Sequence, residues 1–152
     1  MLFGVYEFEV FMSEGWYLAF PYDLPGGTQG EDFEDLCLMV ADWLKITLED
    51  FDMRGETPPK PTFGNAPRHG GANMVFAVQA GRETVEKVTA SEAARLLGVT
   101  PARITQMLAS ARLIGYREGR NTYVTMDSVR ARLEERPRGG RPRKGEAVAA
   151  SA

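Results

Sequence analysis

Charge is divided unevenly along this chain of 152 residues, and that division indicates two modules rather than one. Residues 1–57 contain 2 Lys and Arg against 13 Asp and Glu, a net charge of −11. Residues 58–88 carry a net of +2, and residues 89–152 a net of +6. Such an asymmetry indicates modules with different partners. An acidic module repels nucleic acid and a basic one attracts it, so the overall charge of −3 conceals two opposite surfaces.

Composition excludes several classes of protein. Apolar residues make up 43% and charged residues 26%, an ordinary globular balance. No apolar run reaches 18 residues, so we expect no membrane-spanning helix and no membrane partner. The N-terminus lacks the basic segment and apolar run of a signal peptide. Cys37 is the single cysteine and cannot form an internal disulfide, so we expect a cytoplasmic location.

The acidic half changes its hydrophobic period along the chain. Residues 2–12 and 16–20 have strand character, and the short turn between them predicts an antiparallel hairpin. Residues 33–51 show a helical stripe, after an acidic start that suits the helix dipole. Residues 56–73 contain four prolines and predict a linker, and residues 74–79 predict one more strand.

Alternation in the first strand puts Tyr6 and Phe8 on one face and Glu7 and Glu9 on the other. Large aromatic side chains at strand or helix period usually pack in a core. Three are therefore predicted to be core residues: Trp16, Trp43 and Phe51.

A family resemblance rests on residues 16–36. A D-L-P-G loop at 23–26 and a T-Q-G turn at 28–30 follow the aromatic strand and precede the acidic helix start. This stretch resembles the N-terminal domain of HicB-type antitoxins. The resemblance covers roughly residues 3–80 and implies an α+β fold. Its first part would be a ββαβ, partial RNase H-like domain over 1–80, with the Pro/Gly-rich loop 56–73.

The family's domain binds and masks a small toxin and has no catalytic role. The sequence departs from the common pattern at residues 14–17 and at 21–23, both of which would alter the toxin-facing surface. The toxin-binding residues that we expect are acidic or aromatic: Glu14, Trp16, Asp23, Glu31, Asp32 and Asp35. The alternative for the acidic cluster is a solvated helix start stabilised by the dipole.

The basic half opens with capping signals. Thr89 and Glu92 form a T-x-x-E capping box, and Gly98 suits a left-handed helix end. Thr100 and Pro101 then begin a second helix that we expect to reach about residue 111. Two short helices with this spacing predict a helix-turn-helix, and residues 114–124 predict a hairpin, or wing.

Residues 88–136 resemble the helix-turn-helix modules of the excisionase and MerR-like class. The pattern E-A-A-x-x-L-G-V-T-x-x-x-I, from Glu92 to Ile104, carries the resemblance, together with the wing. The implied domain is a small winged helix-turn-helix that binds DNA. The alternative is a three-helix structural domain with no nucleic-acid role.

In the DNA interpretation the second helix enters the major groove. Arg103 and Gln106 are the best base readers, because Arg pairs bidentately with guanine and Gln with adenine. The full set of expected contacts in the helix-turn-helix and wing is Thr100, Ala102, Arg103, Thr105, Gln106, Arg117, Arg120, Asn121 and Tyr123.

Residues 81–87 are predicted to be a linker, and residues 137–152 a basic tail that is disordered in isolation. The tail includes Gly-Arg-Pro-Arg-Lys, which resembles an AT-hook core that enters a narrow minor groove. A non-specific basic tail is an equal alternative. Its expected DNA contacts are Arg138, Arg141, Arg143 and Lys144.

Enzyme motifs are missing from the sequence. One His and one Cys cannot supply a zinc site, and no nucleotide-binding loop is present, so we expect no catalysis, no metal and no cofactor. A nuclease would need converging carboxylates, for which Glu7, Glu9 and Asp23 are the candidates.

These observations predict an antitoxin that binds a small, basic, HicA-like toxin and represses its own operon by binding operator DNA. A homodimer or higher even oligomer is expected, since helix-turn-helix readers act on paired half-sites. The alternative is a stand-alone regulator whose N-terminal domain senses a signal or oligomerises.

Overall fold

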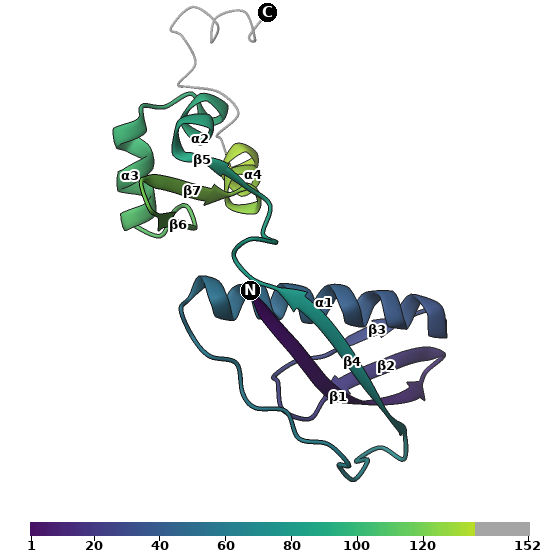
Figure 1. Ribbon diagram of the computed structural model, residues 1–152. Coiled ribbons are helices and arrows are strands. Elements are labelled where there is room, and N and C mark those ends of the chain that lie inside the picture. The colour runs from purple at the N-terminus through teal and green to yellow at the C-terminus, as the bar shows by residue number, and fades with distance from the viewer. Residues whose placement is uncertain (136–152) are drawn as a thin grey trace, which may run out of the picture. The chain divides into compact units, whose positions relative to one another are not determined.

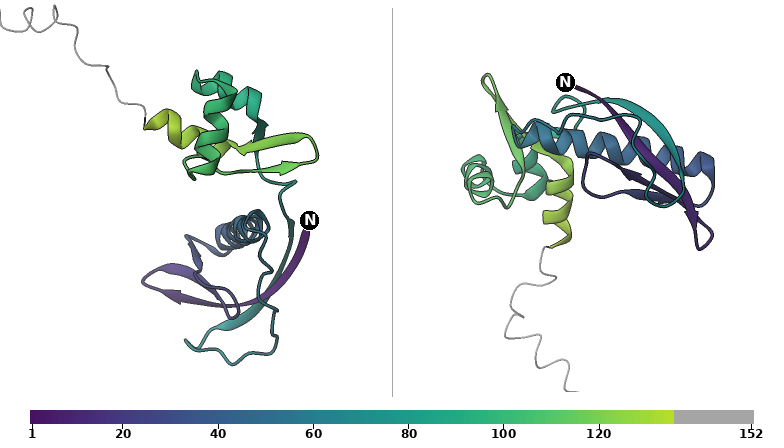
Figure 2. Two further views of the ribbon diagram at one scale, coloured as in Figure 1. Left: turned by 90° about the vertical axis from the view of Figure 1, so that its left-hand side faces the viewer. Right: turned by 90° about the horizontal axis from the view of Figure 1, so that it is seen from below.

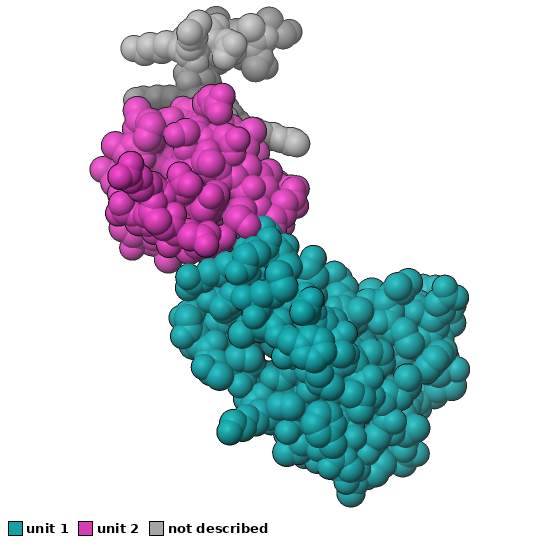
Figure 3. All heavy atoms as spheres, in the orientation of Figure 1, with its two compact units in different colours: residues 1–85 teal, residues 86–152 magenta. Residues whose placement is uncertain are grey.

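A computed structural model of the chain describes residues 1–135. The chain divides into two compact units, residues 1–85 (unit 1) and residues 86–152 (unit 2), coloured separately in Figure 3. Both are mixed α+β structures with antiparallel sheets. Within the described residues, no helix is long and apolar enough to cross a membrane.

Unit 1 is a four-stranded antiparallel sheet covered on one face by a long helix (Figure 1). Its elements, in chain order, are β1 (Leu2–Ser13), β2 (Trp16–Pro21), β3 (Thr28–Gly30), α1 (Phe33–Met53) and β4 (Ala72–Ala80). The strand order is β3-β2-β1-β4. The hairpin, the helix and the last strand lie where the sequence predicted them. The T-Q-G segment, expected to be a turn, instead forms β3 and pairs with β2.

The core of unit 1 lies between the sheet and α1. Four residues at a spacing of four, Leu36, Val40, Leu44 and Leu48, are fully buried along the helix. The helix lies close to β1: a Cβ added at Gly4 would be 2.5 Å from Leu48 Cδ1. Glycine at this position therefore allows the close approach of helix and strand.

The prediction that Trp16 belongs to the core is wrong, since its side chain is 40% exposed. The pairing of β1 with β2 places Trp16 opposite Ser13, and Val10 opposite Ala19. Opposed residues share a face, so Ala19 faces α1 and is fully buried, while Trp16 lies on the outer face. Trp43 and Phe51 do pack against the core, both half-buried.

The proline-rich segment, predicted as a linker and as a loop of the N-terminal domain, lies within unit 1. Residues 59–71, here called the strap, leave the end of α1 and return across the outer face of the same sheet (Figure 1). Hydrogen bonds from the strap reach three carboxylates of the sheet and its loop: Asp23, Glu7 and Glu9. Glu7 and Glu9 are consequently 6% and 2% exposed, although they lie on the face away from the helix.

The described part of unit 2, residues 86–135, combines three helices with a small antiparallel sheet of order β5-β7-β6. Its elements are β5 (Lys87–Thr89), α2 (Ala90–Leu97), α3 (Pro101–Ala109), β6 (Gly115–Glu118), β7 (Asn121–Thr125) and α4 (Met126–Glu134). Its core includes Leu97, Ile104, Leu113, Val124 and Val129. β5 was not expected, because three residues are too few to show a strand period.

Residues 81–87, predicted to be a linker, are shared between the units. Arg82 donates its backbone N–H to Asp52 of α1, and the Thr84 hydroxyl donates to Glu49. Beyond the boundary, Glu86 forms an ion pair with Arg130 of α4, with 2.7 Å between the charged atoms. No free seven-residue connector is therefore present.

Candidate functional sites

The exposed face of α3 carries the residues expected to read DNA. Ile104 and Met107 turn into the core of unit 2. The rest of the first two turns points to solvent, and the five predicted DNA contacts there are all exposed: Thr100, Ala102, Arg103, Thr105 and Gln106. Burial of one stripe therefore leaves all five predicted positions on a single accessible surface.

Arg103 and Gln106 lie beside each other, one helical turn apart. The Arg103 guanidinium donates to Gln106 Oε1 at 3.3 Å, and both side chains are exposed. Both can form the bidentate contacts that distinguish guanine and adenine in a major groove. This contact places the two candidate base readers in one patch.

Thr100 has a structural role that is visible in the same geometry. Its Oγ1 accepts the backbone N–H of Arg103 at 3.2 Å, so it is the N-cap of α3. Gly98, at φ +66°, ends α2 in the left-handed region. The turn between the helices is therefore fixed by Gly98 and Thr100.

The hairpin of β6 and β7 carries the expected wing residues and projects from unit 2 (Figure 2). Arg117, Arg120 and Asn121 are exposed, and Tyr123 is half-buried. The Tyr123 ring lies 5.5 Å from that of Tyr116.

Lys87 was missed by sequence reasoning. Its Nζ lies 5.7 Å from the centre of the Tyr123 ring, because β5 pairs with β7. Only recognition of β5 would have placed this cation beside the wing.

The four expected contacts in the tail, Arg138, Arg141, Arg143 and Lys144, lie outside the described residues. Their charges still contribute to the net charge of unit 2. Residues 86–135 hold 8 Lys and Arg against 6 Asp and Glu, a net of only +2. Most of the net positive charge of the C-terminal module therefore lies in the sequence beyond residue 135.

In unit 1, β-sheet register brings most of the expected toxin-binding residues to one end of the domain. Tyr17 pairs with Gly30, so Trp16 and Glu31 are the next residues on adjacent strands. Glu14 forms the exposed turn before Trp16. The start of α1 reaches the same end, since the rings of Tyr17 and Phe33 lie 6.2 Å apart. We call Glu14, Trp16, Glu31, Asp32 and Asp35 the acidic end.

Two members of the acidic end also cap α1. Asp32 accepts the backbone N–H of Asp35 at 2.7 Å, and Asp35 accepts that of Glu31 at 2.9 Å. These bonds satisfy N–H groups that a helix start leaves unpaired. Asp32 and Asp35 therefore stabilise the start of α1, and this role accounts for part of the acidic cluster in the sequence.

Asp23 does not join the acidic end. It follows β2 at the opposite end of that strand and accepts the backbone N–H of Thr62 in the strap at 2.7 Å. It fastens the D-L-P-G loop to the strap, which is a structural use of the carboxylate.

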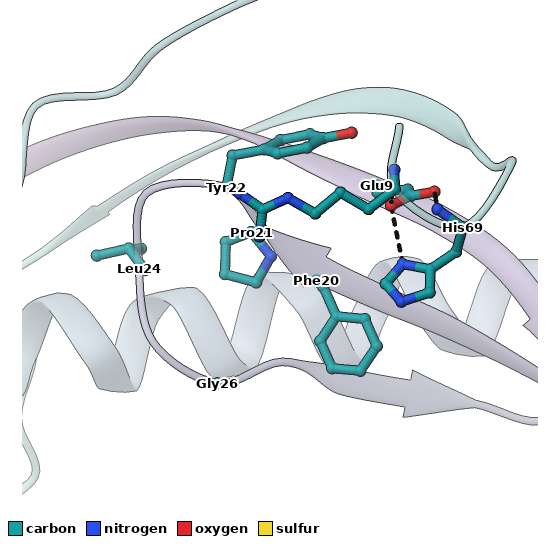
Figure 4. A pocket seen from close by; sticks show the side chains of 8 residues that line it. Glu9, Phe20, Pro21, Tyr22, Leu24, Gly26 and His69 are labelled. Carbon is teal, nitrogen blue, oxygen red and sulfur yellow. Dashed lines mark hydrogen bonds and ion pairs between the residues drawn. The ribbon is translucent and has the colours of Figure 1, made fainter. Parts of the chain in front are cut away.

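A cavity of about 380 Å³ opens where β2 ends and the strap crosses the sheet (Figure 4). It is lined by Glu9, Phe20, Pro21, Tyr22, Leu24, Gly26, Arg68 and His69. The His69 ring stacks on Phe11, with 4.4 Å between ring centres, and its Nδ1 lies 3.1 Å from Glu9 Oε1. The His69 side chain is 50% exposed, and these contacts depend on the return of the strap, which the sequence does not show.

The electrostatics of Glu9 follow from this enclosure. Burial alone would raise the pKa of its carboxyl group. The backbone N–H groups of Arg68, Gly71 and His69 outweigh burial and lower the pKa to about 2. Hydrogen bonds from Asn65 and Gly64 likewise lower the pKa of Glu7. Both groups hold the strap with their charged forms.

No protein-family model matches the chain, and no curated protein is significantly similar to it.

Proposed function

We propose that the chain is an antitoxin and transcriptional regulator, with unit 2 binding operator DNA and unit 1 binding a small basic toxin. The observation that carries the proposal is the α2–turn–α3 arrangement, with Arg103 and Gln106 together on its exposed face. With the β6–β7 hairpin as a wing, unit 2 would be a winged helix-turn-helix.

DNA binding would begin at α3. Its N-terminal half enters the major groove, where Arg103 pairs with guanine and Gln106 with adenine. Phosphate contacts then come from the exposed wing residues Arg117 and Arg120, and from Lys87, whose Nζ lies beside the Tyr123 ring. Residues 86–135 have a net charge of only +2, so the tail would supply much of the non-specific attraction.

Unit 1 would be the partner-binding half. It holds 14 acidic against 5 basic residues, a net of −9, which disfavours nucleic acid and favours a cationic protein. The resemblance to HicB-type antitoxins names the class of partner, a HicA-like ribonuclease toxin, and a partial RNase H-like domain. The acidic end is the proposed docking surface, because Trp16 adds an exposed aromatic anchor to its carboxylates.

The carboxylates that a nuclease would need for metal binding have structural roles in unit 1. Glu7, Glu9 and Asp23 each accept hydrogen bonds from the strap. We therefore propose binding rather than catalysis as the role of unit 1.

The test is co-purification followed by a gel shift. The chain would be co-expressed with the small basic product of the neighbouring reading frame, and the complex titrated onto the DNA upstream of the operon. We expect a stable complex and specific binding of that DNA. Specific DNA binding without any captured partner would favour the stand-alone regulator, and failure of both would contradict the proposal.

Two matched variants separate the two activities. Glu14→Lys with Glu31→Lys reverses charge at the acidic end and is expected to weaken capture of the partner, leaving DNA affinity at or above that of the parent chain. Arg103→Ala should do the reverse. If each variant weakened DNA binding and partner capture equally, the two activities would not belong to separate units.

A further inference from the structure

Strand β4 is a long edge of the sheet of unit 1. It pairs with β1 through nine consecutive residue pairs, from Ala72 opposite Val10 to Ala80 opposite Leu2. The opposite edge of the sheet, β3, has only three residues. Natural proteins usually blunt a long edge with charges, proline or a bulge, because open strands pair with other chains. The sequence of β4, A-N-M-V-F-A-V-Q-A, contains none of these residues, and its register is unbroken.

The edge of β4 has no neighbour within the described part of the chain. There, β4 ends the strand order, and no backbone hydrogen bond joins it to a segment other than β1. In an antiparallel edge strand, every second residue turns its N–H and C=O outward. The outward groups of β4 are therefore available to another strand.

The core beneath this edge is incompletely covered. Met74, Phe76 and Val78 face α1 and pack against the core, yet all three are only half-buried. By contrast Tyr6 and Phe8, their neighbours on β1, are buried. A strand added beside β4 would cover these side chains with its own.

The sequence of β4 favours one partner, a second copy of itself. Around Phe76 the residue types are mirrored: Val75 matches Ala77, Met74 matches Val78, and Ala72 matches Ala80. A two-fold axis at Phe76 would pair each residue with its counterpart in the second copy. Every pair would join side chains of like chemistry, with no charge on either side. Isologous pairing of this kind is the usual basis of a closed dimer.

We infer that two copies of the chain join through β4, antiparallel and centred on Phe76, to form one continuous eight-stranded sheet. This interface does not rest on the antitoxin proposal. It would give the protein its two-fold symmetry through unit 1 and place two copies of unit 2 on one assembly. The partner surface at the acidic end lies on other elements.

A charge exchange at two exposed positions tests the register. In the inferred dimer Val75 lies opposite Ala77 of the partner, and both face away from α1. Val75→Lys with Ala77→Lys therefore places lysine opposite lysine twice, which opposes pairing. Val75→Lys with Ala77→Glu places lysine opposite glutamate twice. Both variants carry the same lysine beside Glu7, so any effect on the strap is shared.

The measurement is the mass of the full chain in solution, by light scattering after gel filtration and by sedimentation over a range of concentrations. We expect the double lysine variant to have half the mass of the wild type, with self-association weakened about tenfold or more. The lysine–glutamate variant should recover the wild-type mass. Circular dichroism checks that each variant is folded, and Ala77→Lys alone replaces the double lysine variant if that one does not fold.

Three results would overturn the inference. These are a monomeric wild type, equal masses for the wild type and the double lysine variant, or a folded lysine–glutamate variant that fails to recover. If the wild type is monomeric and the lysines instead abolish capture of a basic partner, β4 pairs with a strand of that partner. The measurement of mass involves neither DNA binding nor toxin capture. Failure of the inferred dimer can therefore be told apart from failure of the proposed function.

Discussion

At the scale of single residues, Glu9 organises the outer face of the sheet of unit 1. Its carboxylate accepts the N–H groups of Arg68, His69 and Gly71 at 2.8–3.0 Å, and it is 2% exposed. A charged acceptor facing several N–H donors forms strong hydrogen bonds. One strand side chain thereby fixes the position of a proline-rich segment some 60 residues later in the chain.

Glu9→Gln should destabilise unit 1 and change how its stability depends on pH. An amide in this site points an NH₂ group at one of the N–H donors, so at least one hydrogen bond is lost. In the folded protein the pKa of Glu9 is about 2 rather than 4.5. Its contribution is therefore full above about pH 4.5 and is lost as pH falls toward 2.

Urea unfolding followed from pH 7 to pH 2 measures this effect. Between pH 4.5 and 2, Glu9→Gln should take up about one proton fewer on unfolding than the wild type. The control is Glu14→Gln, at an exposed turn position. If stability of Glu9→Gln falls with pH as steeply as in the wild type, Glu9 does not hold the strap by its charge.

Arg103 is the residue on which the DNA proposal depends most. Its guanidinium is exposed and beside Gln106, and it has the geometry for bidentate contact with guanine. Arg103→Ala should cost about 1–3 kcal/mol of operator affinity and relax the preference for the base it reads.

The matched control is Arg130→Ala. Arg130 lies on α4 rather than α3, and it forms ion pairs with Glu86 and Asp127. It should change affinity little and equally for all sequences. Fluorescence anisotropy with operator and mutated operator gives both quantities, and equal losses for the two variants would remove Arg103 from base reading.

At the scale of elements, the start of α3 combines stability and function. Thr100 caps the helix, Pro101 occupies its first position, and Arg103 follows within one turn. The N–H groups at this end are thus organised before any DNA arrives. Thr100, a predicted DNA contact, therefore also stabilises the start of the helix.

Thr100→Ala should destabilise α3 by about 1 kcal/mol, because the N–H of Arg103 loses its acceptor. Thr100→Ser should retain nearly all of the stability. Thr105→Ala, which removes a hydroxyl from the same helix without touching the cap, should cause no loss, since alanine favours helix. Hydrogen exchange of the α3 amides measures each change, and equal protection in Thr100→Ala and wild type would contradict the capping role.

The sequence predicted whether a segment is a helix or a strand more readily than it predicted which side of each element is buried. Alternation and capping residues predicted β1, β2, α1, α2 and α3, because period and caps are local properties. The exposed position of Trp16 was not predictable in this way. It depends on which residue of β2 pairs with Val10, and a shift of one residue exchanges the two faces.

At the scale of the whole molecule, charge is distributed in three parts rather than two. Unit 1 has a net charge of −9, residues 86–135 a net of +2, and residues 136–152 a net of +4. An interface with DNA must therefore combine a nearly neutral reading surface with a strongly basic C-terminal sequence. The acidic unit opposes both at low salt.

Removal of residues 137–152 should weaken DNA binding and flatten its salt dependence. The segment contains Arg138, Arg141, Arg143 and Lys144, and each phosphate contact contributes about 0.9 to the slope of log K against log salt. The slope should therefore fall by up to about 3–4. Removal of residues 146–152, which contain no Lys or Arg, is the control and should leave the slope unchanged. Equal slopes for the two truncations would show that the basic residues do not contact phosphate.

The sequence by itself determined the two-module organisation, most of the elements and the exposed face of α3. The modules follow from the net charge of each segment. The elements and the exposed face of α3 follow from hydrophobic period and capping residues, which are patterns among neighbouring residues. Only the tertiary structure decided the return of the strap onto Glu7 and Glu9, the exposure of Trp16 and the open edge at β4. Each of these depends on strand register and on pairing between segments far apart in the chain, which local sequence does not encode.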